Sequence, residues 1–180
     1  MNNIIYRTAD TRWNLRSGFG NHRFIVRAPA GEYVAATIPW RRQDSEPEKI
    51  GIRICHGERC DGIGSVEIRE LRLLSASRHE GRIIFRAPAA GEYEIYYMPY
   101  TMPGEWYAPE VTYRSPKETT PDEVWLRGTE SAEAVEAEVI AYESRTEFDS
   151  FYPMEIVMTD GERTSFAGER PFTVVAESRA

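Results

Sequence analysis

The sequence has few residues of the types that hold metals or cross-link small scaffolds: two cysteines and three histidines in 180 residues. Structural zinc sites need a second ligand pair at a regular spacing. Cys55 and Cys60 stand in "ICHGERCDGIG" with His56 and Asp61, and no such second pair follows. We therefore expect no metal and no cofactor. Two reduced thiols are favoured, and a disulfide is the alternative that this spacing leaves open.

Long apolar runs and an excess of positive charge are also missing. No stretch approaches the roughly 18 apolar residues of a membrane-spanning helix. The start, "MNNIIYRTADTRW", has neither the basic nor the apolar region of a secretory signal. The formal net charge is −7, whereas nucleic-acid binding needs a basic face. We expect no nucleic-acid or membrane partner and a cytoplasmic location, or secretion if a leader has been removed.

The composition is that of a globular protein, and one motif occurs twice. Hydrophobic residues make up 41% of the chain and aromatic residues 12%, enough for a packed core. The motif reads "RAPAGEYVAATIPW" at 27–40 and "RAPAAGEYEIYYMPY" at 86–100. Each copy follows a β-rich run and resumes strand character after a glycine-containing turn. We interpret the copies as two related β-hairpins, the second with one more alanine in its turn.

Two tyrosines stand at equivalent places in the copies, Tyr33 and Tyr93, just after the turn glycine. In Greek-key sandwiches such a tyrosine hydrogen-bonds back to the preceding corner, a role that we favour over ligand contact. Further strand candidates are "IGIRICHG", "SVEIRELRLL", "EVWLR", "EAEVIAYES" and "MEIVMTD". Many short strands separated by turns predict an all-β fold, an antiparallel two-sheet β-sandwich of galactose-binding or immunoglobulin-like type with little helix. We expect the sandwich over residues 1–160 and the start of a following segment at 161–180.

The segments that leave the two motif copies carry aromatic rings beside charged groups. The first copy ends in Trp40, Arg41 and Arg42, and the second leads to Tyr100, Trp106 and Tyr107. Rings pack on the C–H face of a sugar, and guanidinium groups bind its hydroxyls, so these residues are candidates for carbohydrate binding. The same residue types are enriched where loops pack down or where proteins meet. The packing or interface alternative is therefore favoured.

Glu147 and Asp149 form a candidate acidic pair in "YESRTEFDSFYPMEI". In a strand they would share a face, and glycoside hydrolysis uses two carboxylates. Arg145 lies nearby in the sequence and can pair with Glu147, so a structural role is the favoured alternative. The three histidines stand in separate polar contexts and are interpreted as ordinary surface or loop residues.

Four segments carry a resemblance to a known family: "GNHRFIVRA", "IPWRRQDSEPEK", "GEYEIYYMPY" and "TEFDSFYPMEI". Their order resembles the N-terminal region of bacterial proteins related to glycoside hydrolase family 123. The likeness covers most of residues 13–156, and the segment 55–79 departs from it. The resemblance implies an N-terminal β-sandwich that precedes a catalytic (β/α)-barrel. Such a barrel needs about 250 residues, so this chain cannot contain it and no catalytic residue is carried over.

Three functions follow as alternatives. The first is a non-catalytic module of a glycoside hydrolase that contributes to carbohydrate binding or docks on the catalytic (β/α)-barrel of the same full-length protein. The second is a purely structural module without glycan binding. The third, which is less favoured, is a stand-alone glycosidase that uses Glu147 and Asp149.

Overall fold

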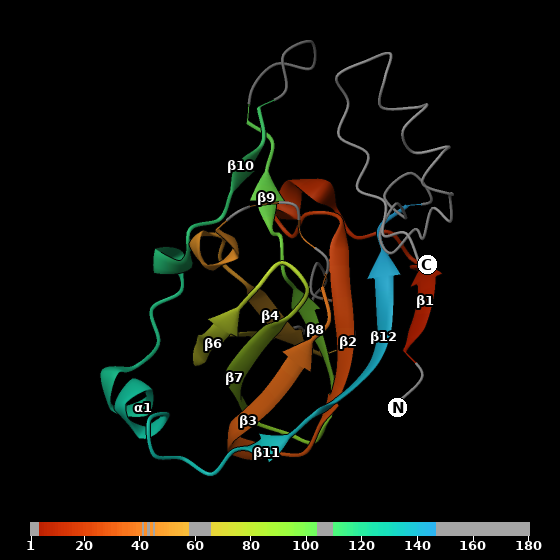
Figure 1. The fold of residues 1–180 in the computed structure, drawn as a ribbon. Helices are drawn as coiled ribbons and strands as arrows, with labels where there is room; N and C mark the ends of the chain where they lie inside the picture. The colour runs from red at the N-terminus through yellow and green to blue at the C-terminus, as the bar shows by residue number, and fades with distance from the viewer. Residues whose placement is uncertain are drawn as a thin grey trace, which may run out of the picture.

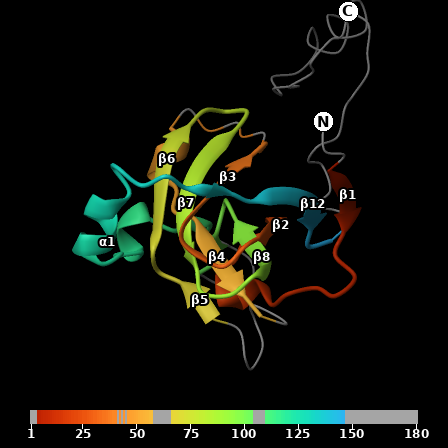
Figure 2. The same ribbon diagram turned by 90° about the horizontal axis from the view of Figure 1, so that it is seen from below.

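The structure, a computed structural model, describes residues 4–40, 42, 44, 46–57, 66–103 and 110–146. These residues form a β-sandwich of two large sheets with one short α-helix, α1 (Figures 1 and 2). This confirms the predicted all-β two-sheet fold with little helix. The predicted boundary between residues 160 and 161 lies outside the described residues. None of the described helices is long and apolar enough to cross a membrane.

The larger sheet has six strands in the order β1-β12-β2-β8-β4-β5, and the smaller has four in the order β11-β3-β7-β6. The six are β1 (Ile5–Thr8), β12 (Glu138–Ser144), β2 (His22–Ala28), β8 (Gly91–Tyr96), β4 (Arg53–His56) and β5 (Val66–Ile68). The four are β11 (Val135–Glu136), β3 (Gly31–Ile38), β7 (Gly81–Ala87) and β6 (Leu71–Ala76). The edge strands β1 and β11 pair in parallel with β12 and β3, and the other described pairings are antiparallel.

The remaining elements are short. A two-stranded ribbon of β9 (Tyr100–Thr101) and β10 (Thr112–Tyr113) projects from one end of the sandwich (Figure 1). The 3-10 turns are η1 (Leu15–Ser17), η2 (Pro47–Lys49) and η3 (Pro116–Glu118), and the α-helix is α1 (Glu123–Gly128). The core lies between the two large sheets. Its largest buried side chains include Phe24, Trp40, Ile54, Phe85, Tyr93, Ile95, Tyr97 and Tyr142.

The two motif copies are not hairpins, and this prediction is wrong. In the first copy the chain passes from β2 in the larger sheet to β3 in the smaller one. In the second copy it passes from β7 in the smaller sheet to β8 in the larger one. Each copy therefore arches over the core. The copies pair with each other instead, β2 with β8 and β3 with β7. Because apolar side chains of both strands of each copy point into the same core, the strands face each other through side chains rather than through backbone hydrogen bonds.

A β-bulge in β3 explains why the copies differ by one turn residue. The register of β3 against β7 shifts between Gly31 and Val34. Val34 then pairs with Phe85, as Tyr93 pairs with Val26 in the other copy. The bulge thus compensates for the shorter turn and restores the alignment of the core. It also moves the tyrosine of the first copy out of the equivalent place.

Tyr33 accordingly does not repeat the role of Tyr93. Its ring stacks on Trp125 of α1, with centroids 5.7 Å apart. Tyr93 is fully buried, and its hydroxyl donates to the carbonyl oxygen of Ala89 at 2.6 Å. The corner role is therefore found for Tyr93 and not for Tyr33.

Tyr93→Phe is expected to lower the free energy of unfolding by about 0.5–1.5 kcal/mol, the contribution of one net hydrogen bond. The ring and its packing against the core stay in place, so the loss reports on the hydroxyl alone. Chemical denaturation measures it. Tyr6→Phe is the control, because Tyr6 is about half exposed, at 47%. A loss in Tyr93→Phe no larger than that of the control would contradict the corner role.

The segment "EVWLR", predicted as a strand, is the helix α1, so this assignment is also wrong. Asp122 caps the helix, because its carboxylate accepts hydrogen bonds from the backbone amides of Val124 and Trp125. An acidic residue that satisfies the free amides of a first turn favours helix over strand. Trp125 anchors the helix by donating from its indole nitrogen to the carbonyl of Glu32 at 3.0 Å.

Cys55 is disulfide-bonded, which corrects the expectation of two reduced thiols. Cys60 lies outside the described residues. The side chain of Cys55 is buried on the outer face of the larger sheet, in a small second core with Ala9, Trp13, Phe19 and Tyr96. The segment between β1 and β2 therefore covers part of that face.

Candidate functional site

Trp40 and Arg42, two of the predicted carbohydrate-binding residues, are buried. Trp40 is 0% exposed and donates its indole hydrogen to the carbonyl of Ser77 at 2.8 Å. The Arg42 guanidinium pairs with Asp44 at 2.7 Å and lies 5.0 Å from the Trp40 ring centre. Both side chains therefore pack the first loop onto the sandwich, as in the packing alternative. Arg41 lies outside the described residues.

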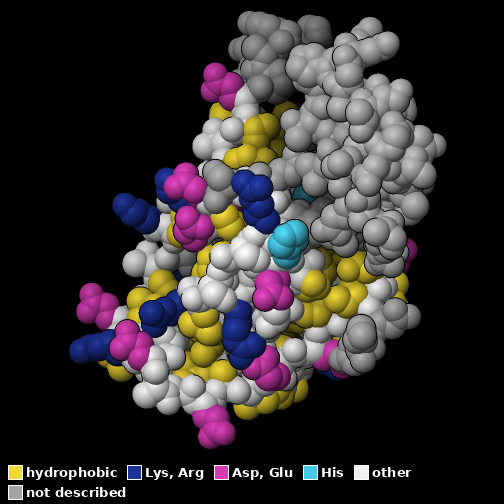
Figure 3. Space-filling model, viewed as in Figure 1, with side chains coloured by type: hydrophobic (Ala, Val, Ile, Leu, Met, Phe, Trp, Pro, Cys, Tyr) yellow, Lys and Arg dark blue, Asp and Glu magenta, His cyan; other side chains and the backbone are white. Residues whose placement is uncertain are grey.

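Tyr100 is the predicted residue that belongs to an accessible surface. It begins β9, and its ring meets that of Tyr113 edge to face, with centroids 5.9 Å apart. The neighbouring side chains of Met102, Val111 and Tyr113 are exposed, so apolar groups gather on the projecting ribbon (Figure 3). Trp106 and Tyr107, between the two strands of the ribbon, lie outside the described residues, as do Glu147 and Asp149.

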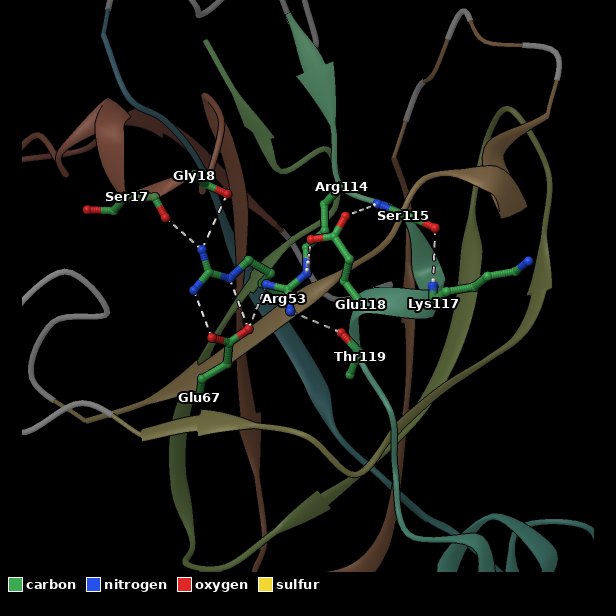
Figure 4. Close-up of polar contacts among 9 residues, drawn as sticks. All are labelled: Ser17, Gly18, Arg53, Glu67, Arg114, Ser115, Lys117, Glu118 and Thr119. Atoms are coloured by element: carbon green, nitrogen blue, oxygen red, sulfur yellow. Dashed lines mark hydrogen bonds and ion pairs between the residues drawn. The ribbon is translucent and has the colours of Figure 1, made fainter. Parts of the chain in front are cut away.

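The base of this ribbon is held by an ionic network around Glu67 (Figure 4). Its carboxylate binds Arg53 of β4 at 2.7 Å and Arg114, which follows β10, at 2.9 Å. Arg53 also donates to the carbonyl of Ser17 at 2.7 Å. The carboxylate thus joins the ribbon to the larger sheet, and Arg53 extends this contact to the turn η1. We call Arg53, Glu67 and Arg114 the Glu67 network.

The local sequence explains how the chain leaves the ribbon. Ser115 and Glu118 form a capping box on η3, in which each side chain binds the backbone of the other residue. Directly before it, the carbonyl of Arg114 accepts a hydrogen bond from the amide of Gly51 at 2.7 Å. A side chain at Gly51 would press on the backbone of Ser115, so glycine permits this close approach.

Glu67 should make the fold sensitive to acid. Burial alone would raise the pKa of Glu67, but hydrogen bonds and charge from Arg53 and Arg114 hold that pKa below its usual range. A carboxyl group whose pKa is lower in the folded chain than in the unfolded chain stabilises the fold at pH values above its unfolded pKa. This stabilisation is lost as the pH falls through the pKa of the folded state. The free energy of unfolding should therefore fall below about pH 4.5, and less steeply in Glu67→Gln.

Denaturation curves between about pH 2 and pH 7 measure this effect, because that range extends to both sides of the usual pKa of a glutamate. Wild type and Glu67→Gln should differ most near neutral pH and converge in acid. Glu133→Gln, at an exposed position, should follow the wild-type curve. Parallel curves for wild type and Glu67→Gln would contradict the paired state of Glu67.

A second surface, a cleft of about 620 Å³, lies on the outer face of the six-stranded sheet. Three rows of side chains run across its strands. One row consists of Arg7, Glu143, Arg23 and Tyr96 from β1, β12, β2 and β8, and the next consists of Ile5, Ala141, Ile25 and Glu94 from the same strands. The third consists of Glu138, Arg27 and Glu92. Residues two apart along a strand share a face, so the rows lie side by side.

The first row is tightly paired. Glu143 is buried and accepts hydrogen bonds from Arg23 at 2.6 and 2.8 Å and from Arg7 at 2.8 Å. Arg23 also pairs with Glu94 and donates to the hydroxyl of Tyr96 at 3.0 Å. Burial raises the pKa of the Tyr96 hydroxyl, so it stays a neutral hydrogen-bond donor. We call Arg7, Glu143, Arg23 and Tyr96 the charged row.

This cleft is not predicted from the sequence, because its residues are far apart in the chain and carry no common motif. The signal that could have found it is alternation. In "GEYEIYY" Glu92, Glu94 and Tyr96 recur at every second position, and in "HRFIVRA" Arg23 and Arg27 stand four apart with Ile25 between them, which places each set on one face of its strand. Among the described residues no group of three or more potential metal ligands lies together.

Comparison with known proteins gives one match. A family model described as "Glycoside hydrolase 123, N-terminal domain" matches residues 11–145. Those residues span most of the sandwich, including the ribbon and the lining of the cleft apart from Ile5, Arg7 and Asp10. No curated protein and no solved structure matches the chain.

Proposed function

Because the chain belongs to the family of the N-terminal domain of glycoside hydrolase 123, we propose that it is a non-catalytic module that docks on the catalytic part of a glycoside hydrolase. The β9–β10 ribbon is the proposed contact. The observation that carries this proposal is the exposure of Met102, Val111 and Tyr113 on a ribbon that projects from the sandwich. Exposed apolar patches of this kind mark interaction sites.

The state of the buried carboxylates supports a non-catalytic role. A glycosidase needs one carboxylic acid with a raised pKa to protonate the leaving group. In the described part of the chain, the carboxylates of Glu67, Glu94 and Glu143 each pair with arginine. Pairing with arginine holds the pKa of Glu67 below its usual range, and the carboxylates of Glu94 and Glu143 are each engaged by a guanidinium group, which suits a structural role.

The ribbon is anchored at its base, which favours a role in docking rather than that of a passive loop. A two-stranded ribbon alone is only marginally stable in water, yet the Glu67 network fixes this one to the larger sheet and to η1. Rigid presentation reduces the entropy lost on association. The proposed partner is the catalytic (β/α)-barrel that the family resemblance implies for the full-length protein.

The test is to titrate the whole chain with the separately produced catalytic part of a family 123 glycoside hydrolase, using calorimetry. Binding is expected, and Tyr113→Ala should weaken it about tenfold or more, as for a central aromatic contact. Val111→Ser should also weaken binding. The matched control is Val124→Ser, since Val124 is exposed on α1 and lies outside the ribbon.

Two outcomes would contradict docking through the ribbon. One is the absence of any binding to the catalytic part. The other is binding that Tyr113→Ala and Val124→Ser leave equally strong, which would place the contact elsewhere on the module.

Glycan binding is a second candidate function. At Trp40 and Arg42 it finds no support, because both side chains are buried. The observation that favours it is the cleft on the six-stranded sheet, which combines ion-paired and apolar side chains at a volume typical of small-molecule sites.

A further inference from the structure

We propose that the cleft on the outer face of the six-stranded sheet binds an uncharged saccharide. Its apolar row would contact the sugar ring, and Asp10 and Arg12 would bind the hydroxyls. This inference rests on the second proposed function, glycan binding, and is independent of docking through the ribbon. It assigns glycan binding to residues other than those predicted from the sequence.

The apolar row provides the contact for a ring. Ile5, Ala141 and Ile25 lie across three adjacent strands in register, and Ile140 also lines the cleft. Ile5 is the exposed member of this row, whereas Ala141 and Ile25 are largely covered. Polar groups flank this row, with the charged row on one side and Arg27 and Glu92 on the other. A pyranose has a similar division, since its C–H face is apolar and its hydroxyls project around the edge. Apolar contact together with hydrogen bonds at the rim would therefore satisfy both parts of such a ligand.

The charges of the lining residues favour a ligand without net charge. Four arginines line the cleft (Arg7, Arg12, Arg23 and Arg27), and so do four carboxylates (Asp10, Glu92, Glu94 and Glu143). Neighbours alternate in sign along Arg7, Glu143 and Arg23 and along Glu138, Arg27 and Glu92, so a bound anion or cation would meet repulsion as well as attraction. A hydroxyl group both donates and accepts. It can therefore use guanidinium and carboxylate groups at once.

Asp10 and Arg12 are the groups most available to a ligand. Both line the cleft and are exposed, and within the described ranges neither forms a hydrogen bond or ion pair through its side chain. The other arginines of the lining are already paired with carboxylates. A ligand can thus bind Asp10 and Arg12 without breaking an existing contact.

Trp13 holds this part of the chain in place. It is buried, donates its indole hydrogen to the carbonyl of Gly20 at 2.7 Å, and accepts at its own carbonyl from Arg145 at 2.9 Å. Its ring lies 4.6 Å from the Arg23 guanidinium. The residues directly before Trp13 are therefore fixed over the charged row, which limits the entropy lost when a ligand binds.

The experiment applies the whole chain to an array of neutral and acidic glycans and measures the affinity for the strongest ligand by calorimetry. Binding to a neutral glycan is expected, with little change in affinity between about 50 and 500 mM salt because no net charge is neutralised. Arg12→Ala should weaken binding about tenfold, as expected for the loss of a hydrogen bond to a charged group. Arg16→Ala is the matched control, because Arg16 is exposed on η1 and does not line the cleft.

The possible failures are distinguishable. If no glycan binds, both glycan binding and this site are wrong. If a glycan binds equally well to wild type, Arg12→Ala and Asp10→Asn, the function stands and the cleft is not its site. If acidic glycans bind best and added salt weakens their binding, the cleft binds sugars, but the inference of an uncharged ligand is overturned. Melting temperatures of the variants should match the wild type, since neither side chain supports the fold.

Discussion

Replacing Trp40 with alanine is expected to lower the free energy of unfolding by about 3–5 kcal/mol, the range for removing a large buried aromatic side chain. The Trp40 indole is fully buried, stacks on Tyr97 with centroids 5.8 Å apart and donates to the carbonyl of Ser77. Gly81 lies directly against the ring, because a Cβ there would overlap it. This close fit leaves little room for the surroundings to fill the cavity that alanine would create.

Urea denaturation of the two proteins measures this loss, and two variants control it. Trp40→Phe should lose less, because an aromatic ring still fills part of the space. Val124→Ala, at an exposed position, should stay within about 0.5 kcal/mol of the wild type. A Trp40→Ala protein that is as stable as wild type but has lost glycan binding would reverse the assignment and make Trp40 a ligand contact.

In the two motif copies the sequence predicts the positions of the strands well, but it predicts poorly how those strands are connected. Both motif copies contain strands where expected, because alternating apolar residues and glycine-containing turns are local signals. The same signals precede a hairpin and an arch between sheets. Whether a hairpin or an arch is formed depends on whether the facing side chains, such as Phe85 and Tyr93, pack against each other in the core. That is a tertiary property, absent from either motif taken alone.

The bulge in β3 shows a second limit. Aligning the copies by their "GEY" triplets makes Tyr33 the counterpart of Tyr93, yet Val34 takes that place in the structure. After the bulge Val34, Ala36 and Ile38 all pack into the core, so the alternation within the strand gives no local sign of the shift. Sequence likeness and structural equivalence therefore differ by one residue over this short stretch.

The burial of Trp40 and Arg42, two of the predicted binding residues, was missed for a different physical reason. Tryptophan and arginine suit both ligands and packed loops, so residue type alone does not separate the two roles. Burial separates them, and burial of Trp40 depends on Gly81, which begins β7 and is distant from Trp40 in the sequence. The cleft is the converse case. Its charged row joins Arg7 to Glu143, two residues from opposite parts of the described chain that only the sheet brings together.

Replacing Glu143 with alanine should lower the free energy of unfolding by about 3 kcal/mol, because it leaves buried positive charge without its main partner. Glu143 accepts hydrogen bonds from both Arg7 and Arg23, and the Arg23 side chain is only 14% exposed. The glutamate also joins β1 to β12 and β2 through side chains. Its loss should therefore weaken the edge of the larger sheet as well as the cleft.

A double-mutant cycle with Arg23→Ala separates this coupling from the cost of each truncation. The two substitutions together should cost clearly less than their sum, since Arg23→Ala removes the charge that Glu143→Ala leaves unpaired. The matched control is the pair Arg27 and Glu92 on the same face, which is 3.3 Å apart but more than half exposed on both sides, and Glu92→Ala should cost less than about 1 kcal/mol. Equal losses in Glu143→Ala and Glu92→Ala would mean that water already solvates the charged row. In that case the cleft would not be preorganised, and a ligand would first have to displace that water.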